Sequence, residues 1–239
     1  MKRALVTGGS GDIGAAICRR LAADGCYVYI HAHHGIAAAQ KLAQEITAAG
    51  GSAEVLQFDV TDSDAVSAVL GPLVEDDPIQ IVVNNAGIHD DAVFPGMRPE
   101  QWHRVIDVSL NGFFNVTQPL MMPMIRSRWG RIINVSSIAG ITGNRGQTNY
   151  AAAKGALNAA TKSLSLEVAS RGITVNAVAP GIIATSMSAS AFDAQAIAGM
   201  VPMKRAGMPE EVADLIGFLA SEQAAYISGQ IISINGGMI

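Results

Sequence analysis

Charged side chains are scarce in this sequence of 239 residues. They make up 15% of it, against about a quarter of an ordinary soluble domain. We therefore expect subunit contacts to cover part of the surface, although a core rich in alanine and glycine would also lower the charged fraction. Basic residues are not in excess, and the net charge of −4 argues against a surface that binds nucleic acid.

Cysteine is nearly absent, and long apolar runs are missing. Cys18 and Cys26 stand at no spacing typical of metal ligands or redox pairs. We expect them to be small buried side chains in a reducing cytoplasm; a reactive thiol is the alternative. The N-terminal apolar run is too short for a signal peptide, and no run is long enough for a membrane span. The cluster of His31, His33 and His34 lacks a carboxylate or cysteine at ligand spacing, so no metal site is predicted.

Helix and strand patterns alternate along the chain. Short runs rich in β-forming residues are apolar at consecutive positions, as in parallel strands that helices cover on both faces. The sequence predicts a single domain, residues 1–239, with a Rossmann-type doubly wound α/β fold: a parallel sheet of about seven strands with helices on both faces. The irregular segment 182–204 is long enough to be a substrate lid. The expected strands are Ala4–Thr7, Tyr27–His31, Ala53–Phe58, Ile79–Asn84, Arg131–Ser136, Thr174–Pro180 and Gln230–Ile234.

A glycine-rich turn joins the first expected strand to the first expected helix. The run from Gly8 to Gly14 lets the backbone come close to a pyrophosphate, and the helix N-terminus supplies free N–H groups. With Thr7, this turn resembles the Thr-Gly-x-x-x-Gly-x-Gly signature of the short-chain dehydrogenase/reductase family. The family's middle glycine is Asp12 here. We expect its carboxylate to cap the helix and point to solvent, rather than to repel a phosphate.

The resemblance implies a nicotinamide cofactor that lies over the strand ends. The acidic residue that holds the ribose 2′-OH of NAD is missing at the end of the second strand, where His33 and His34 stand. A histidine can donate to a 2′-phosphate, so NADP(H) is favoured and NAD(H) stays open. The expected cofactor contacts are Thr7, Gly8, Gly9, Ser10, Asp12, Ile13, Gly14, His33, His34, Asp59, Val60, Asn85, Ala86, Gly87, Tyr150, Lys154, Pro180, Gly181, Ile183 and Thr185.

Tyr150 and Lys154 stand four residues apart on an expected helix, which places both side chains on one face. A phenol with a pKa of about 10 needs a shift of roughly 3 units to exchange protons near pH 7, and one cation about 4 Å away supplies on the order of 4 kcal/mol. Lys154, helped by the positive ring of the oxidised cofactor, is therefore expected to lower the pKa of Tyr150, which acts as acid and base. Ser137, at the end of the preceding strand, is expected to donate to the substrate oxygen. Serine followed by this pair matches the family's active-site signature.

The family places an asparagine on the central helix, where it completes a proton relay to the lysine. In this chain that position is Ser109, and Asn111 lies about 200° further round the helix. Ser109 is a candidate for a shortened relay through a water molecule. The alternative is that Ser109 bends the helix by bonding a backbone carbonyl.

The resemblance runs nearly end to end, and 3-oxoacyl-[acyl-carrier-protein] reductases are the most similar group. It implies NADPH-dependent reduction of a 3-oxoacyl thioester to the 3-hydroxyacyl thioester by a cytoplasmic homotetramer, in biosynthesis of a fatty-acid-like, polyketide-like or polyene-like chain. An acidic carrier protein requires a basic patch, for which Arg128 and Arg171, near Arg126 and Arg131, are candidates. A solvated helix end is the alternative for these arginines.

Two other functions stay open. The fold serves many substrates, so another small ketone or alcohol, an acyl-coenzyme A or a sugar is a possible substrate. A non-catalytic sensor of nicotinamide nucleotides on the same scaffold is the other alternative, although the presence of both Tyr150 and Lys154 argues against it.

Overall fold

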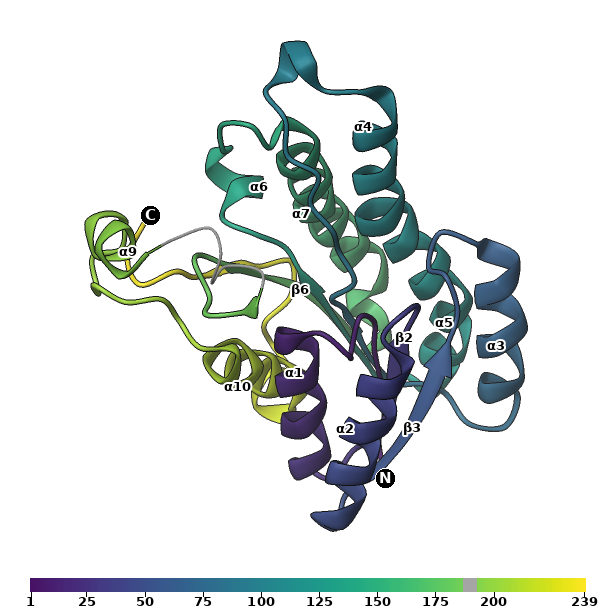
Figure 1. Cartoon of the computed structure of the whole chain (residues 1–239). Helices are drawn as coiled ribbons and strands as arrows, with labels where there is room; N and C mark the ends of the chain where they lie inside the picture. Colours follow the sequence, from purple (N-terminus) through teal and green to yellow (C-terminus); the bar gives the residue numbers. More distant parts are fainter. Residues whose placement is uncertain (187–192) are drawn as a thin grey trace.

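A computed structural model describes residues 1–186 and 193–239. All of its strands run parallel in one sheet with the order β3-β2-β1-β4-β5-β6-β7, and helices cover both faces (Figure 1). The predicted fold class is confirmed, and each expected strand is found. The strands are β1 (Arg3–Val6), β2 (Tyr27–Ala32), β3 (Ser52–Gln57), β4 (Ile81–Asn84), β5 (Gly130–Val135), β6 (Ile173–Pro180) and β7 (Ile231–Ile234).

Two apolar cores lie on the two faces of the sheet. One packs between the sheet and helices α1, α2 and α10, and the other between the sheet and helices α3, α5 and α7. The side chains of a central strand pack into both cores, which explains the consecutive apolar residues. For example, β6 is buried along its whole length, whereas the edge strand β3 buries only Leu56. The longer helices are α1 (Asp12–Ala23), α2 (Ile36–Ala48), α3 (Ser63–Asp76), α4 (Pro99–Ile106), α5 (Gly112–Ser127), α7 (Thr148–Val168) and α10 (Pro209–Ala220).

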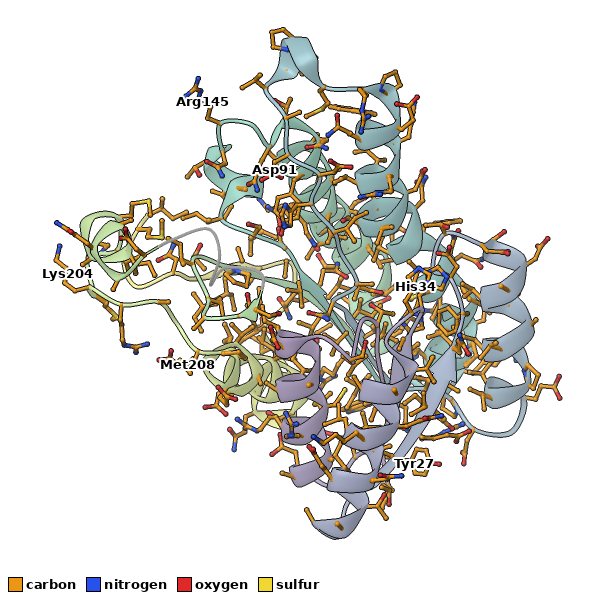
Figure 2. The ribbon with its side chains drawn as sticks, in the orientation of Figure 1. Tyr27, His34, Asp91, Arg145, Lys204 and Met208 are labelled. Carbon is orange, nitrogen blue, oxygen red and sulfur yellow. The ribbon has the colours of Figure 1, made fainter. Side chains whose placement is uncertain are left out.

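The strand order reverses between β1 and β4. Chain segments after β1 leave toward β2 and β3, whereas those after β4 leave toward β5, β6 and β7. A parallel sheet opens a crevice at such a reversal, beyond the carboxyl ends of its strands. Figure 2 shows the two ends: Asp91, which follows β4, lies among the loops at the carboxyl edge, and Tyr27, which begins β2, lies at the opposite edge.

Short helices lie between the main elements. The predicted lid, 182–204, includes residues 187–192, which lie outside the described residues. Its described part contains a bridge between Ile183 and Gly207 and a helix that Asp193 caps. The lid role stays a prediction. The short helices are η1 (Phe94–Gly96), η2 (Asp107–Asn111), α6 (Ala139–Thr142), η3 (Ala169–Arg171), α9 (Ala194–Met200) and η4 (Glu222–Ala224).

Among the described residues, none of the helices combines the length and the apolar character that a membrane crossing requires.

Candidate active site

The glycine-rich turn after β1 has little freedom to change shape. A Cβ on Gly14 would lie 2.2 Å from the carbonyl oxygen of Gly8 and 2.9 Å from Nδ2 of Asn85. Gly8 has φ +63°, in the left-handed region that favours glycine. Nδ2 of Asn85 donates to the carbonyl oxygens of Thr7 at 2.9 Å and Gly8 at 3.1 Å. The turn therefore holds one backbone shape at the N-terminus of α1, where a phosphate binds favourably.

Thr7 joins the ends of β1 and β4. Its buried hydroxyl accepts from the N–H groups of Asn85 and Ala86, both at 2.9 Å. The side chain expected to contact the cofactor is thus engaged in holding the Asn-Asn-Ala-Gly segment against the turn. Val60, another expected contact, is also buried, and its Cγ2 lies 2.9 Å from where a Cβ on Gly112 would stand. Its side chain belongs to the core beneath α5.

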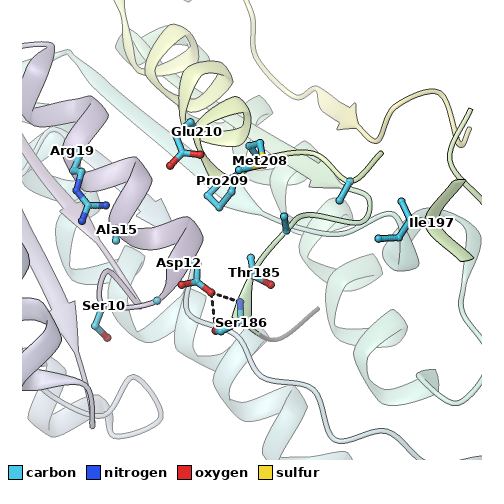
Figure 3. Close-up of a pocket in the computed structure, with 13 residues that line it drawn as sticks. Ser10, Asp12, Ala15, Arg19, Thr185, Ser186, Ile197, Met208, Pro209 and Glu210 are labelled. Atoms are coloured by element: carbon cyan, nitrogen blue, oxygen red, sulfur yellow. Dashed lines mark hydrogen bonds between the residues drawn. The ribbon is translucent and has the colours of Figure 1, made fainter. Parts of the chain in front are cut away.

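Asp12 corrects one prediction. Its side chain makes no cap bond at the start of α1; Oδ2 instead accepts from the backbone N–H and the hydroxyl of Ser186, both at 2.7 Å (Figure 3). The cap prediction was wrong because a distant donor, beyond β6, competes for this carboxylate. Asp12, Thr185 and Ser186 line a pocket of about 580 Å³ between the turn, α1 and α10. The two hydrogen bonds between Asp12 and Ser186, called the clasp below, join the glycine-rich turn to the first part of the segment predicted as a lid.

The strand end expected to select the cofactor has a feature that the sequence did not indicate. The rings of His33 and His34 stack, with 3.7 Å between centroids. Oδ2 of Asp59, which follows β3, lies 3.8 Å from Nδ1 of His33. Burial acts to raise the pKa of Asp59, but bonds from Thr61 and the charges of the two histidines outweigh it, so the pKa is lowered. A carboxylate that could accept from a ribose hydroxyl therefore stands beside donors for a phosphate.

The segment after β6 is held tightly at the same edge. Pro180 accepts at 2.9 Å from the N–H of Ile138, which follows the end of β5. A Cβ on Gly181 would lie 2.8 Å from Cβ of Asn235, so a side chain there would displace the end of β7. Ile183 is buried and pairs with Gly207. These contacts fix the segment that the family resemblance assigns to the nicotinamide end.

The catalytic side chains predicted from the sequence meet at the start of α7. Asn149 is buried, and its Oδ1 accepts from the N–H of Tyr150 at 2.8 Å, which anchors the first turn of the helix. The side chain of Ser137 lies close enough to the phenol of Tyr150 to act on its pKa. Lys154 is buried, with Nζ 5.6 Å from the centroid of the Tyr150 ring and 2.8 Å from the carbonyl oxygen of Val135, to which it donates.

Burial shifts the pKa values of this cluster. Burial raises the pKa of Tyr150; the Ser137 hydroxyl opposes this, and the charge of Asp91 adds to it. Burial also lowers the pKa of Lys154 to about 8. Burial, Ser137 and Asp91 are the influences on the phenol among the described residues, so the lowering expected from Lys154 with the positive ring of the oxidised cofactor stays a prediction. The phenol therefore keeps its proton at neutral pH, as a proton donor must.

Asp91 is a residue of the site that sequence reasoning missed. Oδ2 accepts at 2.9 Å from Gln147, which stands just before α7, and Oδ1 lies 3.2 Å from Nδ1 of His89. These contacts place a carboxylate where its charge acts on Tyr150. No local pattern indicates such a contact, because it joins the segment after β4 to the start of α7.

Ser109 lies in a π-helical turn, η2, in which the N–H of Gly112 donates to the carbonyl oxygen of Asp107. Its side chain is buried, and within the described part of the chain Oγ has no hydrogen-bond partner. The helix-bending bond considered from the sequence is thus not formed. Nζ of Lys154 and Oγ of Ser109 lie 3.2 and 3.6 Å from the point where a Cβ on Gly87 would stand, so they line one small space.

These observations fit a nicotinamide dinucleotide: a phosphate-binding turn, a space that a side chain at Gly87 would fill, and a proton donor at one edge. A model for short chain dehydrogenases matches residues 2–196. The chain belongs to the short-chain dehydrogenase family. It is accordingly an oxidoreductase that acts between an alcohol and a carbonyl group and uses a nicotinamide cofactor.

Relatives within the family match the whole chain. The 3-oxoacyl-[acyl-carrier-protein] reductase FabG of Aggregatibacter actinomycetemcomitans is 44% identical over 236 residues, covering 98% of each chain. The FabG of Escherichia coli strain K12 is 44% identical over 241 residues, which cover 99% of this chain and 97% of that protein. Nodulation protein G of Azospirillum brasilense is 43% identical over 240 residues, with 99% and 98% covered.

The arginines considered for carrier docking lie far from the catalytic cluster. Arg128 precedes β5 and Arg171 precedes β6, whereas Ser137 follows β5. A strand of six residues spans about 20 Å, so the two arginines stand at the opposite edge of the sheet. Arg131 was wrongly included in this surface cluster: it is 2% exposed, with its guanidinium 4.2 Å from the Trp129 ring centroid. Its position in the central strand β5 explains that burial.

Proposed function

We propose that this protein reduces a 3-oxoacyl thioester, carried by an acyl carrier protein, to the 3-hydroxyacyl thioester with NADPH. The proposal rests on the cluster of Tyr150, Ser137 and Lys154, in which Ser137 acts on the phenol and Nζ of Lys154 lies 5.6 Å from the centroid of the ring. The full-length similarity to proteins named 3-oxoacyl-[acyl-carrier-protein] reductase supports the substrate class.

The proposed chemistry divides between the cofactor and the chain. When bound, the reduced nicotinamide supplies a hydride for the carbonyl carbon. The phenol of Tyr150 gives its proton to the carbonyl oxygen, and the hydroxyl of Ser137 donates a hydrogen bond to that oxygen as its charge grows. A water in the space lined by Ser109 and Lys154 would then return a proton toward the phenolate, and the ammonium of Lys154 would stabilise its charge.

The preference for NADPH is part of the proposal. His33 and His34 are exposed at the strand end, where their ring nitrogens can donate to a 2′-phosphate. Asp59 opposes this preference, because its carboxylate can accept from a ribose hydroxyl and would repel a phosphate. The ratio of kcat/KM with NADPH to that with NADH measures which effect is larger.

Carrier docking requires a second copy of the chain. Arg128 and Arg171 cannot flank the catalytic cluster of their own chain, because they lie at the opposite edge of the sheet. We therefore propose that they serve the site of a neighbouring copy within a cytoplasmic homotetramer. Exposed apolar side chains on α5 and α7 support self-association: Phe114, Met122 and Leu166 are 62%, 54% and 84% exposed.

A panel of substrates tests this function. Consumption of NADPH is measured with a 3-oxoacyl carrier protein, the corresponding coenzyme A thioester, simple ketones and no substrate. We expect Tyr150→Phe to lose at least about a hundredfold in rate, and Tyr226→Phe, at a fully exposed tyrosine, to match wild type. Faster turnover of a simple ketone than of either thioester would support the alternative substrate.

Charge reversal tests the docking role. Arg128→Glu with Arg171→Glu should reduce kcat/KM for the carrier-bound substrate about tenfold or more and leave the coenzyme A thioester nearly unaffected. If the double variant and wild type reduce the carrier-bound substrate at the same rate, the docking proposal is wrong. The reductase assignment would not be affected by that result.

A further inference from the structure

His31 is a buried histidine to which the proposed function gives no role. It lies near the end of β2, is 2% exposed, and its ring lies against Phe58, with 4.1 Å between centroids. Both ring nitrogens have partners. Nδ1 accepts at 3.1 Å from the backbone N–H of Gly8, and Nε2 lies 2.9 Å from the carbonyl oxygen of Phe58.

These partners determine the state of the ring. The N–H of Gly8 can only donate, so Nδ1 must carry a lone pair; the carbonyl of Phe58 can only accept, so Nε2 must carry the hydrogen. His31 is therefore neutral, with its proton on Nε2. Burial lowers its pKa from the ordinary 6.5, the bond to the Phe58 carbonyl opposes this, His33 lowers it further and Asp59 acts in the opposite direction. Within residues 1–186 and 193–239, His33 and Asp59 are the titratable groups that act on the ring.

Hydrogen bonds from the β2 side and from the β4 side hold the phosphate-binding turn in place. On the β4 side, Asn85 holds the carbonyl oxygen of Gly8. On the β2 side, His31 holds two successive N–H groups: its ring accepts from Gly8, and its carbonyl oxygen accepts from Gly9 at 2.8 Å. Only the ring bond can be broken by a proton, because the imidazolium has two N–H donors and no acceptor.

We propose that His31 is a positioning residue for the phosphate-binding turn, and that its protonation releases Gly8 and weakens binding of the cofactor's pyrophosphate. The partial positive charge of the N–H groups in the turn, with the N-terminus of α1 beyond it, faces the ring and disfavours the imidazolium. At neutral pH the bond is intact. In acid, the new N–H on Nδ1 of His31 would face the backbone N–H of Gly8. The two donors would repel each other, and the turn would leave the shape that binds phosphate.

Two readouts on the cofactor-free enzyme test the proposal. The first is the pair of imidazole ¹⁵N chemical shifts of His31 at about pH 7.5, assigned with a His31→Gln variant. We expect a proton on Nε2 and none on Nδ1. A proton on Nδ1 at this pH would overturn the proposal, because Gly8 would then have no acceptor.

The second readout is the Kd of NADH, measured by fluorescence from about pH 8 to about pH 5 within the range where circular dichroism is unchanged. In wild type, we expect Kd to rise about tenfold toward the acid end, the loss of roughly one hydrogen bond. His31→Gln keeps one acceptor and one N–H donor but does not titrate, so its Kd should stay nearly constant. His103→Gln, at an exposed histidine on α4, is the control and should follow wild type.

NADH is the informative ligand because it lacks the 2′-phosphate. A pH effect from His33 or His34 on that phosphate would appear with NADPH alone, whereas an effect at the turn should appear with both cofactors. The proposal is overturned if the Kd of NADH does not rise in wild type, or if His31→Gln shows the same rise. Neither result depends on which substrate the enzyme reduces.

Discussion

Replacement of Lys154 by methionine should stabilise the cofactor-free protein while removing activity. The side chain is buried, and burial lowers its pKa from 10.5 to about 8. Each unit corresponds to about 1.36 kcal/mol, so holding the ammonium in this environment costs about 3 kcal/mol. Methionine removes that cost but also removes the bond to the carbonyl of Val135, which is worth about 1 kcal/mol. The net gain is about 2 kcal/mol.

The sign of the pH dependence follows from the lowered pKa. The folded state disfavours the ammonium, so the penalty is complete below about pH 8 and disappears as the pH rises toward 10.5. For a chain of this size, a gain of about 2 kcal/mol raises Tm by roughly 4–8 °C. The advantage of Lys154→Met over wild type should therefore be largest at about pH 7 and shrink by about pH 9.5.

Differential scanning fluorimetry at fixed protein concentration and without cofactor measures the effect. Lys162→Met is the matched control, because Lys162 lies exposed on the same helix, α7; its Tm should change little. A Tm of Lys154→Met at or below wild type near neutral pH, or an advantage independent of pH, would refute the reasoning. The rate of carbonyl reduction should fall by at least about a hundredfold in the same variant.

Other predictions concern the turn, the clasp and the cysteines. Gly14→Ala should weaken NADH binding at least about tenfold through the clash with Gly8. Gly11→Ala, whose Cβ would lie 3.6 Å from the nearest atom, should change it by less than about threefold; equal effects would contradict the packing argument. Asp12→Gly should leave cofactor affinity unchanged, because the carboxylate is bonded to the segment after β6; tighter binding would show that it repels the phosphate. Burial raises the pKa of Cys18 far above its ordinary value, so this thiol should resist Ellman's reagent until the protein is unfolded; rapid labelling of the native protein would contradict its burial.

The fold could be predicted because a buried parallel strand leaves a strong mark on the sequence. β6 is apolar at consecutive positions because each of its faces meets a core, and the prediction of Thr174–Pro180 differs from the structure by one residue. The start of β4 was less exact. The ladder begins at Ile81, although Gln80 already donates to the carbonyl of Arg3, so this boundary depends on how far the neighbouring strand extends.

The site could be predicted where its geometry is local. The spacing of Tyr150 and Lys154 placed both on one face of a helix whatever the rest of the fold did. The bond from Asp12 to Ser186 joins residues 174 positions apart, and the contact of Asp59 with His33 joins two different strand ends. Such contacts depend on how elements pack, which no spacing along the chain contains.

The burial of Arg131 was missed for a related reason. A run of arginines reads as a basic surface, yet this one lies in a central strand, where Glu222 and a tryptophan ring accept it. The arginine-rich composition of the segment predicted that Arg131 is exposed, whereas its position in the strand buries it. Arg128 and Arg171, the two docking candidates, are exposed but stand at the edge of the sheet opposite their own site.

The π-helical turn at Asp107–Asn111 also makes the site sensitive to the length of the chain. A π-turn accommodates one residue more than an α-helical turn, and each residue of an α-helix turns it by about 100°. Deletion of Leu110 would let this turn close into regular α geometry, with Gly112 still bonded to the carbonyl of Asp107 and still packed against Val60. The change would therefore fall on the direction of the Ser109 side chain, while the start of α5 keeps its place. The extra residue of the π-turn is thus what directs the hydroxyl of Ser109 into the space that it shares with Nζ of Lys154.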